Sequence, residues 1–312
     1  MQTVAIIGLG ALGVLFAEEL SPHLAPGDLR IVADRERVER YERDGVYANG
    51  TRLALNYVDA QEALPPADVV IFAVKFSGLP QAIEAARQQV GEHTLILSAL
   101  NGIASEELLS DAFGRDKVLY CVAQGMDAVK VGNHLTYSTR GFIRIGEQTA
   151  GAVTPRVEAL AEFLLAHGMP CQVSPDMPHH LWGKLMLNVG VNQAVAVFEG
   201  DYGTIQQPGR PREVMIAAMR EVMALAPYEA VTLTEDDLTY WLSVLDTLGA
   251  SGKPSLRQDL AQLQARAAGL RQQKAHWESR LSMENDKFQT ISQRRYAEAA
   301  AELDAAELQL QT

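Results

Sequence analysis

The residues that decide the fold stand near the amino terminus, where the chain reads VAIIGLGALG over residues 4–13. The apolar run Val4–Ile7 predicts a buried strand, and the helical pattern that follows as far as Leu20 predicts a helix. Between them lies the loop Gly8-Leu9-Gly10-Ala11-Leu12-Gly13. Its glycines permit a tight turn, the approach of a pyrophosphate to the backbone, and close packing of the helix on the sheet. We therefore predict a dinucleotide-binding loop, with the pyrophosphate at the helix N-terminus, in preference to a plain strand–turn–helix unit.

Strands and helices continue to alternate after this loop. Further apolar runs lie between turn residues at Leu29–Ala33, Val69–Val74, Thr94–Leu97 and Val118–Val122. Helical patterns such as Leu79–Val90 separate several of them, and this order predicts a parallel sheet with right-handed crossovers. The run Tyr137–Ile145 predicts one or two closing strands. We expect a Rossmann-type doubly wound domain over residues 1–174.

The second half of the chain changes to helical patterns. Those at Pro178–Phe198, Glu213–Leu225 and Glu235–Leu248 predict an all-helical domain over residues 175–259. Residues 260–312 carry apolar residues at a heptad-like spacing typical of a coiled-coil-like tail, and a weak break at Ser282–Asp286 allows the tail to fold into a hairpin. The predicted fold class is α/β, with an N-terminal doubly wound sheet, an all-helical domain and an atypical helical tail.

Composition excludes several classes of protein. The 312 residues are 47% apolar and carry a net charge of −12, which argues against a nucleic-acid or anionic-membrane partner. No run approaches the roughly 18 apolar residues of a membrane span, and the N-terminus lacks a signal-peptide pattern. Cys121 and Cys171 stand alone, so we expect no disulfide framework, no metal site and a reducing, cytoplasmic location. The last proline is Pro254 and only Gly269 follows among glycines, so the tail differs from the body.

The residues after the second predicted strand bear on the choice of dinucleotide. Asp34 stands about twenty residues beyond the glycine loop, where an acidic side chain accepts a hydrogen bond from a ribose 2′-hydroxyl and favours NAD. Arg35 and Arg37 stand beside it and can pair with a 2′-phosphate, which favours NADP. Arg37 and Arg40 also fit a solvated helix face that alternates with glutamates. The residues alone leave both dinucleotides open.

A polar strip interrupts an otherwise apolar predicted helix at Leu181–Asn192. Lys184, Asn188 and Asn192 are spaced i, i+4 and i+8, so they share one face. A buried lysine is unfavourable by several kcal/mol, on the order of magnitude found for buried charges, unless it is paired or faces a cleft. The strip therefore predicts a polar ligand, and the competing interpretation is a structural network with Lys184 paired to a carboxylate.

Two more polar residues follow predicted strands at the edge of the sheet where ligands bind in open α/β folds. Lys75 follows Val69–Val74, and Asn101 follows Thr94–Leu100. Either one also fits an ordinary loop residue, because polar side chains are common in such loops.

Taken together, these residues resemble the ketopantoate reductase (2-dehydropantoate 2-reductase) family over about residues 1–259. The matching segments are Gly8–Gly13, Val74-Lys75, Asn101-Gly102, LWGKLMLN over residues 181–188, and KPSLRQD over residues 253–259. The resemblance implies a Rossmann domain, a helical domain and an active site between them. It implies reduction of 2-dehydropantoate to (R)-pantoate with NADPH, a step toward pantothenate and coenzyme A, with NADH as the other possible cofactor.

The resemblance also implies roles for single residues. Lys184 would be the general acid, and Asn101 and Asn188 would hold the substrate, with Asn101 near the cofactor as well. Ser255 would bind the carboxylate or hydroxyl end of the substrate, and Lys75 would lie near the nicotinamide ribose. The family is often dimeric, which implies a homo-oligomer with a small 2-oxo acid as its ligand.

The chain departs from the family pattern in its last third. A substrate-binding glutamate is expected about twelve residues after Ser255, where this chain has Ala267, and a position that is usually polar is Tyr202. The stretch Arg294–Glu298 looks like the segment that normally carries the glutamate, so an antiparallel return of the tail would bring Glu298 near the level of Ala267. The alternatives are a reductase of another branched 2-oxo acid and a nucleotide-binding protein with little or no turnover.

Overall fold

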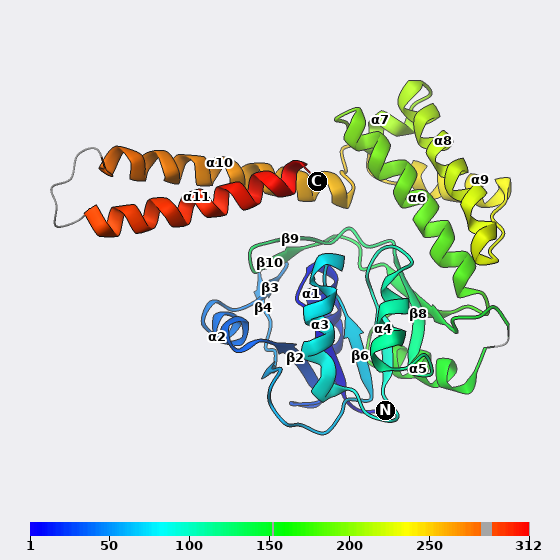
Figure 1. Ribbon diagram of the computed structural model, residues 1–312. Helices are drawn as coiled ribbons and strands as arrows, with labels where there is room; N and C mark the ends of the chain where they lie inside the picture. The colour runs from blue at the N-terminus through cyan, green and yellow to red at the C-terminus, as the bar shows by residue number, and fades with distance from the viewer. Residues whose placement is uncertain (152, 282–288, 312) are drawn as a thin grey trace. The chain divides into compact units, whose positions relative to one another are not determined.

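The computed structural model describes residues 1–151, 153–281 and 289–311 (Figure 1). The chain forms two compact units. The first comprises Met1–Leu185 with Met223–Thr234, and the second comprises Met186–Val222 with Glu235–Thr312.

The first unit is built on an eight-stranded sheet with the order β12-β11-β8-β7-β6-β1-β2-β5. Its strands are β1 (Val4–Ile7), β2 (Leu29–Ala33), β5 (Tyr57–Asp59), β6 (Val69–Phe72), β7 (Leu95–Ser98), β8 (Val118–Gln124), β11 (Phe142–Gly146) and β12 (Cys171–Val173). Neighbouring strands run parallel except β8 and β11, which are antiparallel. The predicted doubly wound sheet is confirmed, because the chain starts at β1 and adds strands first on one side and then on the other.

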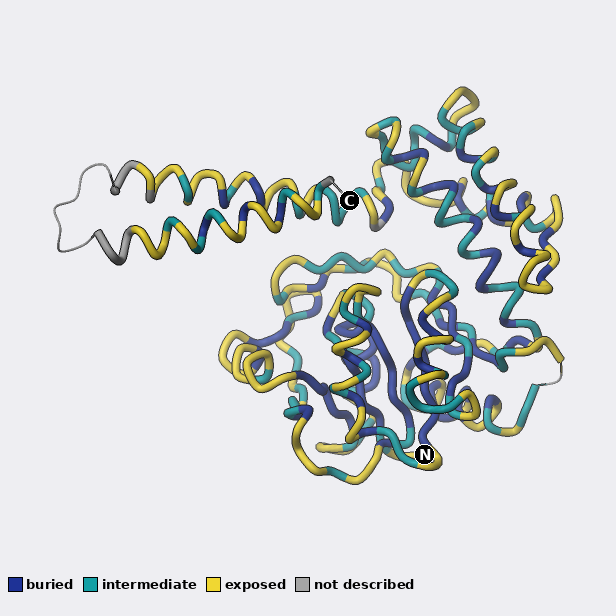
Figure 2. Tube along the Cα trace, in the orientation of Figure 1, coloured by how far each residue is buried: buried dark blue, intermediate teal, exposed yellow. Residues whose placement is uncertain are grey.

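Helices cover both faces of this sheet, as the alternation of side chains along its strands requires. In β1, Val4 and Ile6 join a buried cluster with α1 (Ala11–Leu20) and α5 (Pro155–Ala166). Ala5 and Ile7 join the opposite cluster, with α3 (Leu79–Ala86) and α4 (Ser105–Phe113). The first unit also contains the helix α2 (Arg35–Asp44) and the short helices η1 (Phe76–Gly78) and η2 (Arg87–Gln89). Figure 2 shows the strands as the buried centre of the unit.

A second, four-stranded sheet with the order β4-β3-β10-β9 was not expected from the sequence. Its strands are β3 (Tyr47–Ala48), β4 (Thr51–Arg52), β9 (Val129–Val131) and β10 (His134–Thr136). The prediction of strand across residues 137–145 is correct only from Phe142 onward, where β11 begins. The strands of the four-stranded sheet contain two or three residues each, and β3 pairs with β10 from a distant part of the chain. No local sequence pattern therefore indicates them.

The three helices predicted for residues 175–259 are present as α6 (Met177–Val197), α8 (Arg210–Leu225) and α9 (Glu235–Asp246). The sequence did not indicate the short elements α7 (Tyr202–Gln206) and η3 (Ala226–Glu229). The boundary between the two units falls within α6, between Leu185 and Met186.

The tail forms two packed helices, α10 (Ser255–Leu281) and α11 (Gln289–Gln311). Ala267 and Leu270 of α10 pack with Leu303 and Ala306 of α11, and Arg271 forms an ion pair with Glu307 at 2.8 Å. Exposed residues dominate the outer sides of both helices (Figure 2). The hairpin agrees with the heptad-like pattern, while the predicted break at residues 282–286 lies outside the described residues.

Among the helices of residues 1–151, 153–281 and 289–311, none is both long and apolar enough to cross a membrane. Cys121 and Cys171 are free and buried, and burial raises the pKa of the Cys171 thiol to about 12. Both thiols are therefore protonated at neutral pH, which makes them poor nucleophiles.

Candidate active site

The glycine loop joins the end of β1 to the start of α1 and is packed against the end of β6. Gly8 has a φ of 98°, and a Cβ placed there would lie 2.5 Å from Val74 Cγ1. A Cβ on Gly13 would overlap the carbonyl oxygen of Gly8. Both positions therefore exclude any larger residue, since a side chain would push the loop off the sheet.

The start of α1 has the features that a bound pyrophosphate requires. Its N-cap is Gly10, no side chain caps it, and its first turn carries no acidic residue. A Cβ on Gly10 would lie 3.1 Å from the carbonyl oxygen of Ala73, so glycine lets the loop pack tightly against the end of β6. The residues present fit a dinucleotide, because backbone N–H groups and the positive end of the helix dipole remain for its phosphates.

The acidic residue after β2 is fixed by its own helix. Asp34 is the N-cap of α2 and accepts a hydrogen bond from the backbone N–H of Arg37 at 2.9 Å. The Nε of Arg37 lies 3.4 Å from the Asp34 carboxylate, and the Nε of Arg35 lies 3.1 Å from Glu39. Each arginine predicted to meet a 2′-phosphate is thus paired with a carboxylate, although these exposed pairs are worth only about 0–1 kcal/mol.

Lys75 and Asn101 lie at the carboxyl ends of the adjacent parallel strands β6 and β7, as predicted. Lys75 is exposed at the N-cap of η1. Asn101 is exposed in the loop between β7 and α4, next to Gly102, whose φ is 105°. Because the two strands are hydrogen-bonded neighbours, both residues stand at one edge of the sheet.

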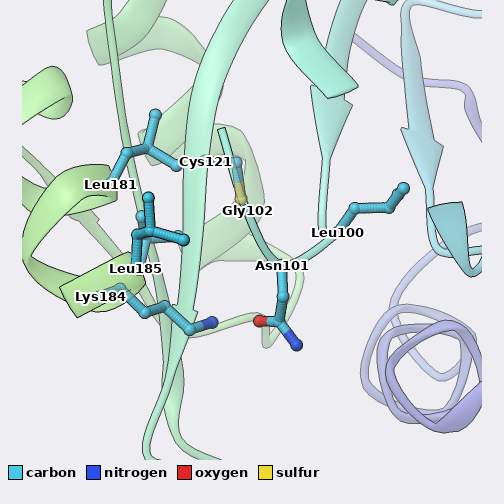
Figure 3. A pocket seen from close by; sticks show the side chains of 8 residues that line it. Leu100, Asn101, Gly102, Cys121, Leu181, Lys184 and Leu185 are labelled. Atoms are coloured by element: carbon cyan, nitrogen blue, oxygen red, sulfur yellow. The ribbon is translucent and has the colours of Figure 1, made fainter. Parts of the chain in front are cut away.

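Lys184 meets this edge of the sheet in a small pocket. The pocket is lined by Leu100, Asn101, Gly102, Cys121, Val122, Leu181, Lys184 and Leu185. Figure 3 shows the Lys184 amino group, which comes from α6, and the Asn101 side-chain amide pointing toward one another. The structure therefore brings together two of the residues that the sequence singled out separately.

Among the described residues, one hydrogen bond holds the amino group of Lys184. Lys184 Nζ donates a hydrogen bond to the carbonyl oxygen of Ala123 on β8 at 2.5 Å. In the part of the chain that the structure describes, it forms no ion pair, which removes the competing prediction of a carboxylate partner. Burial lowers the pKa of Lys184 from its ordinary value of 10.5 to about 8. A cation with a lowered pKa in a pocket is typical of a functional acid or base.

The other residues of the polar strip continue along α6. Asn188 and Asn192 are half-buried and lie four and eight residues beyond Lys184, on the same face of the helix. Ser255 is the first residue of α10, and its side chain lies outside what the structure describes.

The tail returns antiparallel as expected, but Glu298 does not stand opposite Ala267. Ala267 packs with Leu303 and Ala306, which stand further along α11. Glu298 instead pairs with Arg294 at 2.9 Å and Arg295 at 3.3 Å, both in its own helix. These pairs at i, i+3 and i, i+4 spacing are the local contacts of a solvated helix face.

Sequence reasoning missed three buried polar residues beside the pocket, Ser98, Ser105 and Glu106. They form a hydrogen-bonded chain between the end of β7 and the start of α4. The only available signal was an acidic residue in the first turn of a helix, which usually indicates an exposed carboxylate that favours the helix dipole.

This geometry defines a Rossmann-type dinucleotide-binding protein with a lysine pocket at the carboxyl edge of its sheet. The family model described as ketopantoate reductase PanE/ApbA matches residues 4–149, and that described as ketopantoate reductase PanE/ApbA C terminal matches residues 176–265. The chain belongs to the ketopantoate reductase family, a family of oxidoreductases.

Similar proteins agree with this assignment. A 2-dehydropantoate 2-reductase of Halobacterium salinarum is 26% identical over 266 residues, which are 83% of this chain and 86% of that protein. The crystal structure of 2-dehydropantoate 2-reductase from Geobacter metallireducens has a TM-score of 0.71 and 25% identity, and the match covers 82% of this chain and 86% of that one. A ternary structure of D-mandelate dehydrogenase with NADH and anilino(oxo)acetate shares the fold, with a TM-score of 0.74, 16% identity, and coverage of 98% and 99%.

Proposed function

We propose that this protein reduces 2-dehydropantoate to (R)-pantoate with a reduced nicotinamide dinucleotide, and that Lys184 is the general acid. The observation that carries the proposal is the position of Lys184, a lysine with a lowered pKa that faces Asn101 in a pocket at the carboxyl edge of the sheet. Family membership supports the substrate class, and the glycine loop supports the dinucleotide.

Lys184 supplies the proton that the reaction needs. The glycine loop and the start of α1 would hold the reduced dinucleotide, which would supply hydride for the ketone carbon of the substrate. Charge then develops on the ketone oxygen, and the Lys184 ammonium stabilises this charge and donates a proton to the oxygen. The hydrogen bond to the Ala123 carbonyl holds Nζ in place and leaves its other protons for the substrate.

The asparagines hold the substrate for this transfer. Asn101 offers an amide that both donates and accepts hydrogen bonds beside Nζ. Asn188 and Asn192 extend the polar face of α6 beyond Lys184, and we assign them to binding of the substrate's polar groups together with Ser255. Glu298 is left out of this set because its carboxylate is paired within α11.

For the dinucleotide we propose NADPH, as the family resemblance implies, with NADH as the alternative that Asp34 favours. Arg35 and Arg37 are the cations available to a 2′-phosphate, and their present ion pairs are weak enough to exchange. Asp34 is held at the N-cap of α2, where its carboxylate favours a 2′-hydroxyl and repels a 2′-phosphate. The ratio of kcat/KM for the two dinucleotides decides between them.

The experiment is consumption of the reduced dinucleotide with 2-dehydropantoate by the wild type and by Lys184→Ala. We expect the substitution to lower kcat by roughly a hundredfold or more, in the range found for general acids, and to leave dinucleotide affinity unchanged. Lys253→Ala, which alters an exposed lysine, serves as the matched control for folding. Equal turnover in Lys184→Ala would overturn the assigned role.

A second candidate function follows from Ala267. This residue is buried in the α10–α11 interface, where the family resemblance places a substrate-binding glutamate. The absence of this glutamate favours a reductase of another branched 2-oxo acid, or a protein that binds the dinucleotide with little turnover. A panel of 2-oxo acids assayed beside 2-dehydropantoate separates these functions.

The assembly and location of the protein stay predictions. We propose a homodimer in the cytoplasm with a small 2-oxo acid as its ligand and no nucleic-acid or membrane partner. Light scattering on the purified full-length chain measures the assembly directly.

A further inference from the structure

The loop that carries Asn101 is short, and its ends are joined by buried side chains. It runs from Ala99 to Ala104, between the last residue of β7 and the first residue of α4. Ser98 and Ser105 flank it, and both are buried. Their hydroxyl oxygens lie 2.8 Å apart, so a side-chain hydrogen bond closes the base of the loop.

The hydrogen bonds at this base run in one direction. Ser105 Oγ donates to Glu106 Oε2 at 2.8 Å, which uses its single proton. Ser98 Oγ must therefore donate to Ser105 Oγ, and it accepts from the backbone N–H of Leu100 at 3.3 Å. These hydrogen bonds therefore form a series that starts at the backbone N–H of Leu100, passes through the hydroxyls of Ser98 and Ser105, and ends at the carboxyl group of Glu106.

Glu106 is an unusual residue for the first turn of a helix. It is 1% exposed, whereas Glu107 beside it is exposed to solvent. Its Oε1 has no hydrogen-bond partner among the described residues, so burial of the carboxyl is only partly compensated. Burial raises the pKa of Glu106 to about 7. Because burial of the Glu106 carboxyl is unfavourable and the helix does not require it, we infer that this carboxyl holds Ser105 in place.

The outer side of the loop offers little else to fix it. A Cβ built on Gly102 would meet no atom within 4 Å, so this side of the backbone is open. Asn101 is exposed, and its amide reaches the pocket only because the loop backbone keeps its direction (Figure 3). The two serines and Glu106 hold the loop at its base, the burial of Leu100 holds its first half, and Ile103 packs against Leu181 of α6.

We propose that Ser98, Ser105 and Glu106 are positioning residues that set the place of the Asn101 amide opposite Lys184. This inference rests on the proposed function, in which Asn101 binds the substrate near the general acid. The three residues touch neither substrate nor dinucleotide. They act through Asn101, because loss of the chain frees the loop and an ångström-scale displacement of a binding group weakens its contact with the substrate.

The experiment compares Ser105→Ala and Glu106→Ala with two conservative variants. We expect both alanine variants to raise the KM for 2-dehydropantoate by about tenfold, with kcat changed by less than about threefold, because the misplaced group binds the substrate and the acid is untouched. Glu106→Gln keeps an oxygen that accepts from Ser105 and is expected to restore a KM close to that of the wild type. Glu107→Gln is the matched control on the exposed side of α4.

A double-mutant cycle separates positioning from general support of the fold. Asn101→Ala combined with Ser105→Ala should raise KM no further than Asn101→Ala alone, because the chain acts only through the asparagine. Additive effects, or an unchanged KM in Ser105→Ala and Glu106→Ala, would overturn the proposal. A KM in Glu106→Gln as high as in Glu106→Ala would also overturn it, since charge and not hydrogen bonding would then be at work.

A readout without turnover distinguishes failure of this inference from failure of the proposed function. Amide hydrogen exchange of residues 99–104 should be faster in Ser105→Ala than in the wild type and unchanged in Glu107→Gln. If the wild type fails to reduce 2-dehydropantoate while exchange still increases, the proposed function is wrong and the loop is held as described. Equal exchange in the wild type and Ser105→Ala contradicts the positioning role itself.

Discussion

Replacing Lys184 with methionine is expected to remove turnover and to stabilise the folded protein at neutral pH. Methionine has a similar length and no charge, so it fills the same space between α6 and β8 without a proton to donate. Because burial lowers the pKa of Lys184 to about 8, the folded state holds this proton less tightly than the unfolded chain does. The charged lysine therefore destabilises the folded state.

The magnitude follows from the two pKa values. The difference between 10.5 and about 8 corresponds to about 3 kcal/mol. The whole penalty is present below pH 8, and it disappears as the pH rises from about 8 to 10.5, where both states lose the proton. Loss of the hydrogen bond to the Ala123 carbonyl offsets about 1–3 kcal/mol of the gain. We expect Lys184→Met to be more stable than the wild type by about 1 kcal/mol at pH 7.

Urea unfolding of both proteins between pH 7 and pH 10 measures this effect. Between pH 8 and pH 10 the stability of Lys184→Met relative to the wild type should fall by about 2 kcal/mol, as the wild type loses its penalty, so that the wild type becomes the more stable protein. Lys253→Met, which alters an exposed lysine, should show no such dependence on pH. A variant that is less stable than the wild type by the same amount at every pH would refute the reasoning, because Lys184 would then be a structural cation.

Three further substitutions test the cofactor site and the tail. Gly13→Ala should raise the dissociation constant of the dinucleotide by roughly tenfold or more, because its Cβ overlaps the Gly8 carbonyl and overpacking of this kind is worth about 1–3 kcal/mol; unchanged affinity by calorimetry would contradict the packing argument. Asp34→Ala should raise the ratio of NADPH to NADH kcat/KM and lower stability by about 1 kcal/mol through loss of the α2 cap, and a fixed ratio would dismiss Asp34 as a determinant. Glu298→Ala should leave the KM for 2-dehydropantoate within about twofold, because its pairs with Arg294 and Arg295 are exposed and weak; a rise in KM would return it to the site.

The elements of the fold that could be predicted are those that short-range sequence patterns specify. The glycines of residues 8–13 and the apolar runs of β1, β2, β6, β7 and β8 carry their structural reason in their own sequence, because turn chemistry and strand burial are short-range. The pairing of β3 with β10 is different. It joins two segments of two or three residues that are distant in the chain, so only tertiary structure defines it.

The candidate site divides in the same way. The spacing of Lys184, Asn188 and Asn192 predicted one polar face of a helix, and that face is present. The partner of Lys184 is a backbone carbonyl, at Ala123, which no side-chain pattern can indicate. Glu106 and Glu107 are identical adjacent residues, yet the first is buried and the second is exposed. Residue type alone therefore could not predict which of them supports the site.

The pH dependence of kcat/KM for reduction of 2-dehydropantoate tests the role of Lys184 most directly. A general acid must carry its proton, and the pKa of Lys184 is about 8. We predict that kcat/KM of the wild type is level below about pH 8 and falls about tenfold for each further pH unit, and that this fall is absent from the residual activity of Lys184→Ala. A wild-type profile that stays level to pH 10, or the same fall in both proteins, would contradict the assignment of Lys184 as the general acid.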